Sequence, residues 1–263
     1  MLGTVQGMRV LLFALEERWV SPTRLPKILR AAGFEVAVAA TRRTRLNQSA
    51  FINERFALER PLSRSRWLLK EIERWRPDIV IPADEKALRM LRFLAAGHCW
   101  VAGRSRTART VIDCSLGAPR FRHAWGRREE VQQIARACGV RVPPSAPIAT
   151  LDDAMAFVGR HGYPAVVKSD DTYAGGAVRI CCDEHQLRRA VERLLMRAPA
   201  KPALGERMRR MLDRALGEFV DEKSLHLSIQ GFVCGIPVHR CFVAYRGQVW
   251  AGVRQSRSRS FRR

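Results

Sequence analysis

The sequence predicts an α/β lobe followed by an α+β part, because the arrangement of its apolar runs changes along the chain. In the first third, short apolar runs alternate with helical patterns, which is typical of a parallel sheet with crossover helices. Further on, two apolar runs flank a short glycine-bearing loop and are followed by a helix, which is typical of an antiparallel pair. With 263 residues and 47% hydrophobic content, the chain can bury a core in each part.

The first third reads as a βαβαβ unit. We expect three strands and two helices there, and this order predicts a small parallel, Rossmann-like sheet with right-handed crossovers. Gly33 ends the first helix and Pro77 ends the second. The expected strands are residues 9–14, 35–39 and 78–82, and the expected helices are residues 22–32 and 67–75.

The turn after the first strand excludes a nicotinamide cofactor. Residues 15–22 contain no glycine, whereas the dinucleotide fingerprint needs several. Ser21 and Asp84 follow strands and precede helices, at the sheet edge where ligands of open α/β sheets bind. Both residue types are also ordinary helix N-caps, so a substrate edge and plain capping are both open.

Residues 97–126 read as a linker with one helix over about 104–114, and we place a domain boundary near residue 120. The next expected helix runs over about 127–138 and begins with Arg127 and Arg128. Its first-turn cations either reach a bound anion or are solvated.

The stretch 162–180 combines a lysine with a permissive loop. Pro164 to Val167 is a β-branched run typical of a buried strand, and Lys168 stands at its end. Small and polar residues follow up to Ala177, before a second apolar run at 178–181 and a helix from Asp183. Backbone of this kind can approach phosphate oxygens closely, so the unit predicts a phosphate clamp; a structural lysine is the alternative.

These residues resemble the ATP-grasp enzymes. Gly162-Tyr-Pro-Ala-Val-Val-Lys168, with its small glycine-bearing loop and Val178-Arg-Ile180, is similar to the family's central subdomain. The helix and exit at 130–144 and the strand at 227–240 are similar to the flanking elements of that family. The resemblance covers nearly the whole chain, more loosely in its N-terminal third, and implies a pre-ATP-grasp lobe followed by an incomplete ATP-grasp domain.

The resemblance implies ATP as the ligand. Lys168 and Arg128 would contact its phosphates, although relatives usually carry a lysine at the position of Arg128, and arginine differs in geometry. The segment from Ser169 to Ala177 would cover the phosphates, with Tyr173, Gly175 and Gly176 in the flap. Ala177 stands where relatives have a second glycine, which restricts φ there.

The adenine would lie against a hinge formed by Gln230, Gly231, Phe232 and Val233. Its backbone would offer an N–H and a carbonyl, and Phe232 and Val233 would give apolar cover. Relatives often carry glutamate at position 231 and a ribose-binding acid where this chain has Ile236 and Pro237, which departs from the pattern. The alternative is an ordinary alternating core strand.

The family reaction joins a carboxylate to an amine or similar nucleophile through an acyl phosphate, with Mg²⁺ on the ATP. The expected Mg²⁺ ligands, an acid and a Glu-x-Asn element, are not seen, because no acid follows Glu222. We therefore expect a truncated, catalytically impaired ligase. Non-catalytic nucleotide binding is a second reading. The carboxylate, the nucleophile and the oligomeric state are not identified by the sequence.

Composition bears on partners and location. The net charge is +22 and only six of the 47 basic residues are lysines, so general arginine enrichment with nonspecific nucleic-acid attraction is expected; a basic nucleic-acid-associated protein with an RNA-binding tail is the alternative. No membrane-spanning run or export signal is visible, so we expect a cytoplasmic protein. Seven cysteines without paired spacing predict reduced thiols.

The expected domains are 1–120, 121–253 and a disordered basic tail at 254–263. An inserted helix is expected within 199–222. Its apolar stripe reads as ordinary packing. The stripe consists of Met208, Met211, Leu212, Leu216 and Phe219.

Overall fold

The chain forms two compact units, each described here by itself. One consists of residues 1–138 and 197–225, and the other of residues 139–196 and 226–263. The expected domain limits near 120 and 253 stay predictions. The computed structural model describes residues 7–58, 64–97, 105–124, 128–169, 177–196, 204–215, 218–220, 226–236, 238–245 and 247–256.

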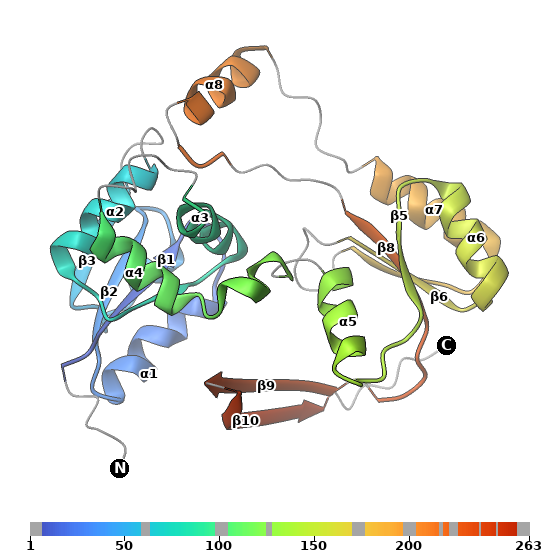
Figure 1. Ribbon diagram of the computed structural model, residues 1–263, viewed down its shortest axis with the longest axis horizontal. Coiled ribbons are helices and arrows are strands. Elements are labelled where there is room, and N and C mark those ends of the chain that lie inside the picture. The colour runs from blue at the N-terminus through green and yellow to red at the C-terminus, as the bar shows by residue number, and fades with distance from the viewer. Residues whose placement is uncertain are drawn as a thin grey trace. The chain divides into compact units, whose positions relative to one another are not determined.

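The first unit is built around a four-stranded sheet with α-helices and 3-10 helices in its connections (Figure 1). Its elements are β1 (Arg9–Ala14), η1 (Ser21–Arg24), α1 (Leu25–Ala31), β2 (Glu35–Thr41), η2 (Arg45–Gln48), β3 (Glu54–Leu58), α2 (Arg64–Trp75), β4 (Ile79–Pro82), α3 (Glu85–Ala95), α4 (Arg106–Ser115), η4 (Pro119–Ala124), α5 (Arg128–Ala137) and α8 (Leu204–Ala215).

This sheet is parallel throughout, in the order β3-β2-β1-β4, which confirms the predicted fold class of the lobe. Alternate residues of β1 enter opposite cores: Leu11 and Phe13 pack in a cluster with residues of α2, α3 and α4, and Leu12 packs in another with residues near α1 and η2. Both faces are therefore buried, as a parallel sheet requires. Strand β3 was missing from the sequence-based expectation.

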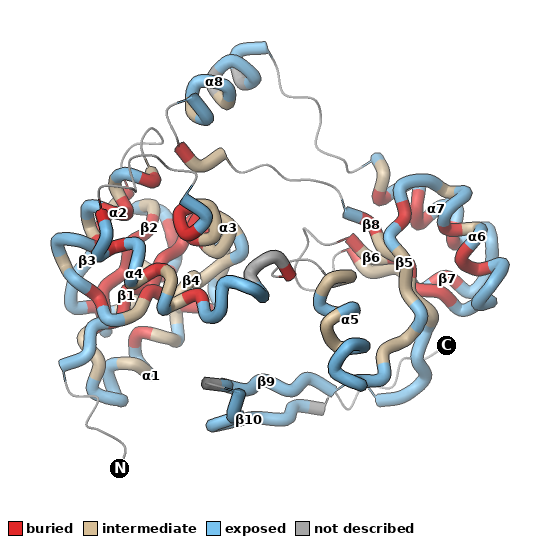
Figure 2. The backbone as a smooth tube through the Cα atoms, viewed as in Figure 1, coloured by how far each residue is buried: buried red, intermediate tan, exposed pale blue. Residues whose placement is uncertain are grey.

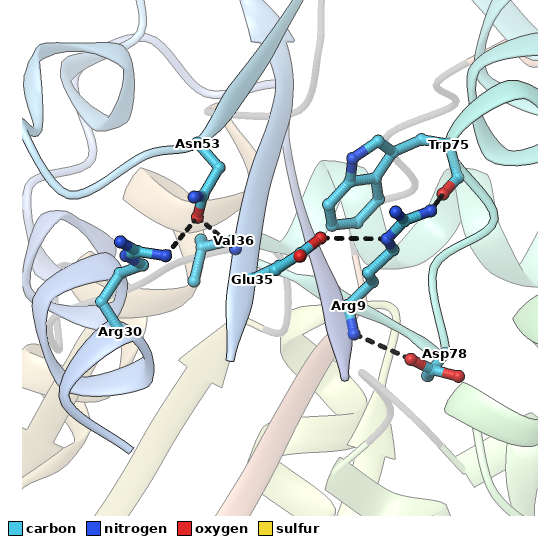
Figure 3. Close-up of polar contacts among 7 residues, drawn as sticks. All are labelled: Arg9, Arg30, Glu35, Val36, Asn53, Trp75 and Asp78. Atoms are coloured by element: carbon cyan, nitrogen blue, oxygen red, sulfur yellow. Dashed lines mark hydrogen bonds and ion pairs between the residues drawn. The ribbon is translucent and has the colours of Figure 1, made fainter. Parts of the chain in front are cut away.

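Polar contacts tie the amino ends of the strands together (Figure 3). The Arg9 backbone N–H donates to Asp78 Oδ2 at 2.7 Å, and its guanidinium donates to Glu35 Oε2 and to the Trp75 carbonyl oxygen, each at 3.0 Å. Asn53 Oδ1 accepts from the Val36 N–H at 2.9 Å. These contacts join the starts of β1, β2 and β4 to one another.

At the carboxyl ends of the strands, the Asp84 carboxylate joins the residues after β1 to the start of α3. Its Oδ1 accepts from the Ala87 N–H at 2.8 Å, which makes Asp84 the N-cap of α3. Its Oδ2 accepts from the N–H groups of Leu15 and Glu16 at 2.7 and 2.9 Å. Capping is thus confirmed for Asp84. The predicted N-cap role is wrong for Ser21, because Ser21 is the first residue of η1 and Val20 occupies the N-cap position.

The second unit contains a four-stranded antiparallel sheet in the order β5-β8-β6-β7 and a separate two-stranded hairpin. This α+β arrangement confirms the predicted class of the second part. Its elements are β5 (Ser145–Ile148), α6 (Leu151–His161), β6 (Ala165–Ser169), β7 (Val178–Cys181), α7 (Glu184–Leu195), β8 (Leu227–Gly231), β9 (Val238–Tyr245) and β10 (Gln248–Ser256).

Helix α6 begins and ends with clear local signals. Thr150 Oγ1 accepts from the Asp153 N–H, and the Asp153 carboxylate accepts from the N–H of Thr150, forming a capping box. The N–H groups of Ala149 and Thr150 lower the pKa of Asp153 below its ordinary value. Gly162 follows with φ 73, a left-handed conformation that glycine adopts without strain, so the helix stops there.

The inserted helix α8 does not pack as expected. Met208, Met211 and Leu212 are 65%, 71% and 55% exposed, so the expected packing of this stripe is wrong for these three residues. Helical spacing of apolar residues shows that a helix has an apolar face, but it does not show that another element covers that face. Leu216 lies outside the described residues, whereas Phe219 does pack, with its ring centroid 5.7 Å from that of Phe93.

The hairpin of β9 and β10 is exposed along both strands (Figure 2). Strand β10 extends to Ser256, three residues into the segment expected to be a disordered tail, and residues 257–263 lie outside the described ranges. Among the described helices, none has the length and apolar character to span a bilayer.

Candidate functional site

One face of the antiparallel sheet is covered and the other presents Lys168. Helix α6 packs against β5 and β8, α7 packs against β6 and β7, and the two helices also contact each other. Ala165, Val167 and Ile229 are fully buried on this covered face. Because side chains alternate along a strand, their neighbours lie on the opposite face. We call that face the lysine face; it consists of Ser145, Pro147, Val166, Lys168, Val178, Ile180, Ser228 and Gln230.

Lys168 and Gln230 meet on the lysine face. In the register of β6 and β8, Lys168 lies opposite Ser228, and Gln230 lies opposite Val166. The Lys168 ammonium reaches diagonally across the pair and donates to Gln230 Oε1 at 2.6 Å. Both side chains are partly buried. The structure thus brings together the predicted phosphate-binding lysine and the first predicted hinge residue, 62 positions apart in sequence.

Three apolar side chains lie beside this polar pair, whose cross-strand neighbours also include Ser145 and Ser228. Val166, Val178 and Ile180 lie on the same face, with Val166 7% exposed and Ile180 38% exposed. An apolar bed beside a single ammonium suits a ligand with one flat apolar part and one anionic part. The sequence analysis named these residues only as strand formers; their alternation with buried neighbours was the signal that could have placed them in the site.

The predicted flap begins and ends at one point. The Ser169 N–H donates to the Ala177 carbonyl oxygen at 3.2 Å, so the ends of the intervening segment are held together. Ser169 is 3% exposed and pairs with Leu227 on the covered face, so its backbone borders the lysine face and its side chain does not. Tyr173, Gly175 and Gly176 lie outside the described residues, and their contact with phosphate stays a prediction.

The hinge backbone is only partly available to a ligand. The Gly231 N–H donates to the Pro144 carbonyl oxygen at 2.9 Å, and the Phe232 N–H donates to the Pro164 carbonyl oxygen at 3.0 Å. Within the described ranges, Val233 is the next residue whose N–H has no such partner, and its side chain is 62% exposed. Among Gly231, Phe232 and Val233, the Val233 N–H is therefore the candidate donor to a base.

Arg128 is the first residue of α5, as the sequence suggested. Its side chain lies outside the description, and α5 belongs to the first unit. A phosphate contact by Arg128 stays a prediction.

Two groups near the site have raised pKa values. Burial raises the pKa of the Cys181 thiol to about 11, and the neighbouring Cys182 and Asp183 add to the shift. Cys181 lies on the covered face opposite Ala165, so it is a protonated core residue. Burial likewise raises the pKa of Tyr163, with a further contribution from Glu184. Neither group supplies a nucleophile or a base at neutral pH.

Metal ligands are not gathered in the described part of the chain. No three His, Cys, Asp or Glu side chains there are placed to hold a metal ion. A hollow of about 670 Å³ lies instead in the first unit, where Lys27, Ile28 and Phe51 form part of its lining. It belongs to a different unit from Lys168, so we do not take it as the site.

Sequence comparison assigns the central part of the chain. Residues 127–219 match the family described as "Carbamoyl-phosphate synthase L chain, ATP binding domain". The carbamoyl phosphate synthase large chain of Gemmatimonas aurantiaca is 26% identical over 181 residues, which are 68% of this chain and 15% of that protein. The corresponding protein of Rhodopirellula baltica is 34% identical over 80 residues, 30% of this chain and 7% of that protein. The chain thus spans a small part of these relatives.

Solved structures share the fold over most of the chain. An N5-carboxyaminoimidazole ribonucleotide synthetase in complex with ADP has a TM-score of 0.64 and 11% identity, covering 98% of this chain and 56% of that one. An L-amino acid ligase from Bacillus licheniformis has a TM-score of 0.58 and 14% identity, covering 97% of this chain and 52% of that one.

These matches, the parallel lobe and the antiparallel sheet define a protein of the ATP-grasp fold. The chain thus has the fold of the ATP-grasp proteins, and its residues 127–219 match an ATP-binding domain family, which confirms the resemblance seen in its sequence.

Proposed function

We propose that this chain binds ATP on the lysine face and the hinge, as the nucleotide-binding part of an ATP-dependent ligase. The observation that carries the proposal is the Lys168 ammonium, which lies 2.6 Å from Gln230 Oε1 on the lysine face, at the end of strand β6. A phosphate group would accept from Lys168, and the base would lie toward Phe232 and Val233. The likeness to structures solved with ADP supports this orientation.

Each part of the site has a separate task in this proposal. Lys168 binds phosphate oxygens, and Tyr173, Gly175 and Gly176 cover them and exclude water. The Val233 N–H would donate a hydrogen bond to the base, because the N–H groups of Gly231 and Phe232 already donate to the carbonyl oxygens of Pro144 and Pro164. Arg128 adds a second cation for the phosphates. Fixing a polyphosphate in this way orients its terminal group for attack and offsets developing negative charge.

The chemistry proposed for an enzyme with this site is carboxylate activation. A carboxylate oxygen attacks the γ-phosphorus of ATP and ADP leaves, which gives an acyl phosphate. An amine then attacks the acyl carbon and phosphate leaves. The carboxylate and the amine belong to substrates that this chain does not identify, and the described residues do not fit a Mg²⁺ site, so we derive no step through a metal.

The proposal includes slow turnover by residues 1–263 alone. The sequence carries no Asp or Glu after Glu222, so the hinge strand and the hairpin contribute no carboxylate to ATP chemistry. Each ~1.4 kcal/mol of lost transition-state stabilisation lowers the rate about tenfold. We expect Mg²⁺-dependent phosphate release from ATP to stay near background with a panel of amino and hydroxy acids. Robust acceptor-dependent turnover would contradict this part of the proposal.

Binding itself is tested by calorimetry with the whole chain. A charge-assisted phosphate contact contributes ~1.5–3 kcal/mol, so Lys168→Ala should weaken ATP binding about ten- to hundredfold. Lys70→Ala, at an exposed position of α2, is the matched control and should leave the affinity unchanged. Equal affinity of the wild type and Lys168→Ala, with both folded by circular dichroism, would remove Lys168 from the site.

A further inference from the structure

The hairpin of β9 and β10 carries two arginines that have no role in the proposed ATP site. We propose that one face of this hairpin binds single-stranded nucleic acid, with Arg240 and Arg254 on backbone phosphates and Phe242 stacked on a base. This second site is separate from the one proposed for ATP, because none of its residues lies on the lysine face or in the hinge.

The two arginines face each other across the hairpin. Arg240 of β9 and Arg254 of β10 are directly opposite in the antiparallel register, so their side chains leave the same face. Both residues are exposed, and among the described residues neither guanidinium has a hydrogen bond or an ion pair. Like charges directly opposite each other destabilise a strand pair. An anion bound between them would offset this repulsion, and phosphate oxygens can accept from both guanidiniums.

An aromatic ring and a glycine lie beside the arginines. Phe242 and Gly252 are directly opposite on the same face, two positions nearer the turn than Arg240 and Arg254. Phe242 is 61% exposed, and Gly252 has no side chain to cover it. A Cβ atom at Gly252 would lie 3.8 Å from Arg240 Nε, so the Arg240 side chain reaches diagonally across the hairpin toward the glycine. A cation and an open ring therefore lie together, a combination that binds a phosphate and its base.

The sequence around the hairpin suits a polyanion. Residues 223–263 contain eight Lys and Arg residues and no Asp or Glu, so no carboxylate of this segment repels a second or third phosphate. An acidic polypeptide would also match the charge, but its carboxylates offer no flat partner to an exposed phenyl ring. Every base has a π-face, so the ring favours nucleic acid, and binding should tolerate any sequence.

The salt dependence of RNA binding by the whole chain tests the two arginines. The probe is a fluorescein-labelled uridine oligonucleotide of about 12 nucleotides, and its anisotropy is measured from ~50 to ~200 mM salt. Arg240→Ala combined with Arg254→Ala should lower the slope of log K against log salt by about 1.4, which is about 0.7 for each lost phosphate contact. Arg66→Ala combined with Arg189→Ala removes the same charge from exposed positions of α2 and α7, and should change the slope by less than about 0.5.

Phe242→Ala tests the stacking. Loss of one stacked base should weaken oligonucleotide binding about five- to hundredfold at an unchanged salt slope, because the ring carries no charge. Phe242→Trp should retain the affinity. Val243→Ala, on the opposite face of β9, is the matched control and should have no effect. Inorganic polyphosphate has no bases, so it should bind equally to the wild type and to Phe242→Ala.

Three results would overturn the proposal. Equal slope changes for the hairpin pair and the helix pair of arginines would leave only general charge attraction. Equal losses of polyphosphate and oligonucleotide affinity in Phe242→Ala would remove base stacking. Tighter binding of polyglutamate than of the oligonucleotide would assign the hairpin to an acidic polypeptide. Circular dichroism reports whether each variant is folded. If Phe242→Ala does not fold, Phe242→Leu keeps an apolar side chain without the ring and should show the same loss, and full affinity of Phe242→Leu would contradict the stacking.

Discussion

The buried carboxylate of Glu218 should anchor the inserted segment to the first unit. Glu218 is 8% exposed, and its Oε2 accepts from the Ser65 backbone N–H at 3.0 Å. Ser65 Oγ in turn accepts from the Phe219 N–H at 3.1 Å. Ser65 lies in the first turn of α2, where N–H groups lack helical partners and a negative charge is favourable. These two hydrogen bonds join α2 to the inserted segment, and Ser65 and Glu218 are 153 residues apart in the sequence.

The loss of unfolding free energy caused by removing the Glu218 carboxylate can be worked out from its contacts. Glu218→Ala leaves the buried Ser65 N–H without its acceptor, which costs ~1–3 kcal/mol, and removes a charge at a helix N-terminus, which costs up to ~1 kcal/mol. We expect the free energy of unfolding to fall by about 2 kcal/mol. Glu218→Gln keeps an acceptor oxygen and should cost about half as much.

Urea unfolding followed by tryptophan fluorescence measures this, since α2 carries Trp67 and Trp75. Glu73→Ala, at an exposed position of the same helix, is the control and should change stability by less than ~0.5 kcal/mol. The reasoning is refuted if Glu218→Ala is no more destabilising than Glu73→Ala.

Three further predictions concern other parts of the chain. Cys182 is exposed and should react with iodoacetamide at pH 8, while the folded chain protects Cys181; because the pKa of Cys181 rises from 9.0 to about 11 on folding, its contribution to stability should decline between those pH values, and labelling of Cys181 at the Cys182 rate would contradict its burial. Asp84→Ala removes three bonds to backbone N–H groups and should lower the unfolding free energy by ~1–2 kcal/mol, more than Asp84→Asn, and equal effects would refute the role of the carboxylate. Deleting 257–263 removes four arginines and should lower the salt slope of RNA binding by at most ~3, and a sequence-dependent loss would favour a specific RNA-binding tail.

Local signals predicted much of the fold. Strands β1 and β7 were placed to the residue and α7 was placed closely, because their patterns are bounded by glycine, proline or a capping acid. Helix α6 was missed although Thr150 and Asp153 form a capping box that the sequence displays. Strand β3 was missed for a different reason: only Phe56 and Leu58 are buried in it, and charged residues precede them.

The site depends on pairing that no local pattern reveals. Strand β8 enters the sheet between β5 and β6, out of sequence order, and this places Gln230 beside Lys168. The sequence identified Lys168 from its strand end and the loop that follows, and Gln230 through a family resemblance, but gave no indication that they touch. The stripe of α8 shows the opposite limit, since helical spacing describes an amphipathic face and cannot say what covers it.

Hydrogen exchange with and without ATP tests the central claim most directly. If ATP binds on the lysine face and the hinge, amides at 165–169, 177–181 and 227–233 should be protected by ATP in the wild type and much less in Lys168→Ala. Adenosine should protect the hinge alone. Protection confined to the hollow between α1 and Phe51, or no ATP-dependent change on β6 and β8, would contradict the account.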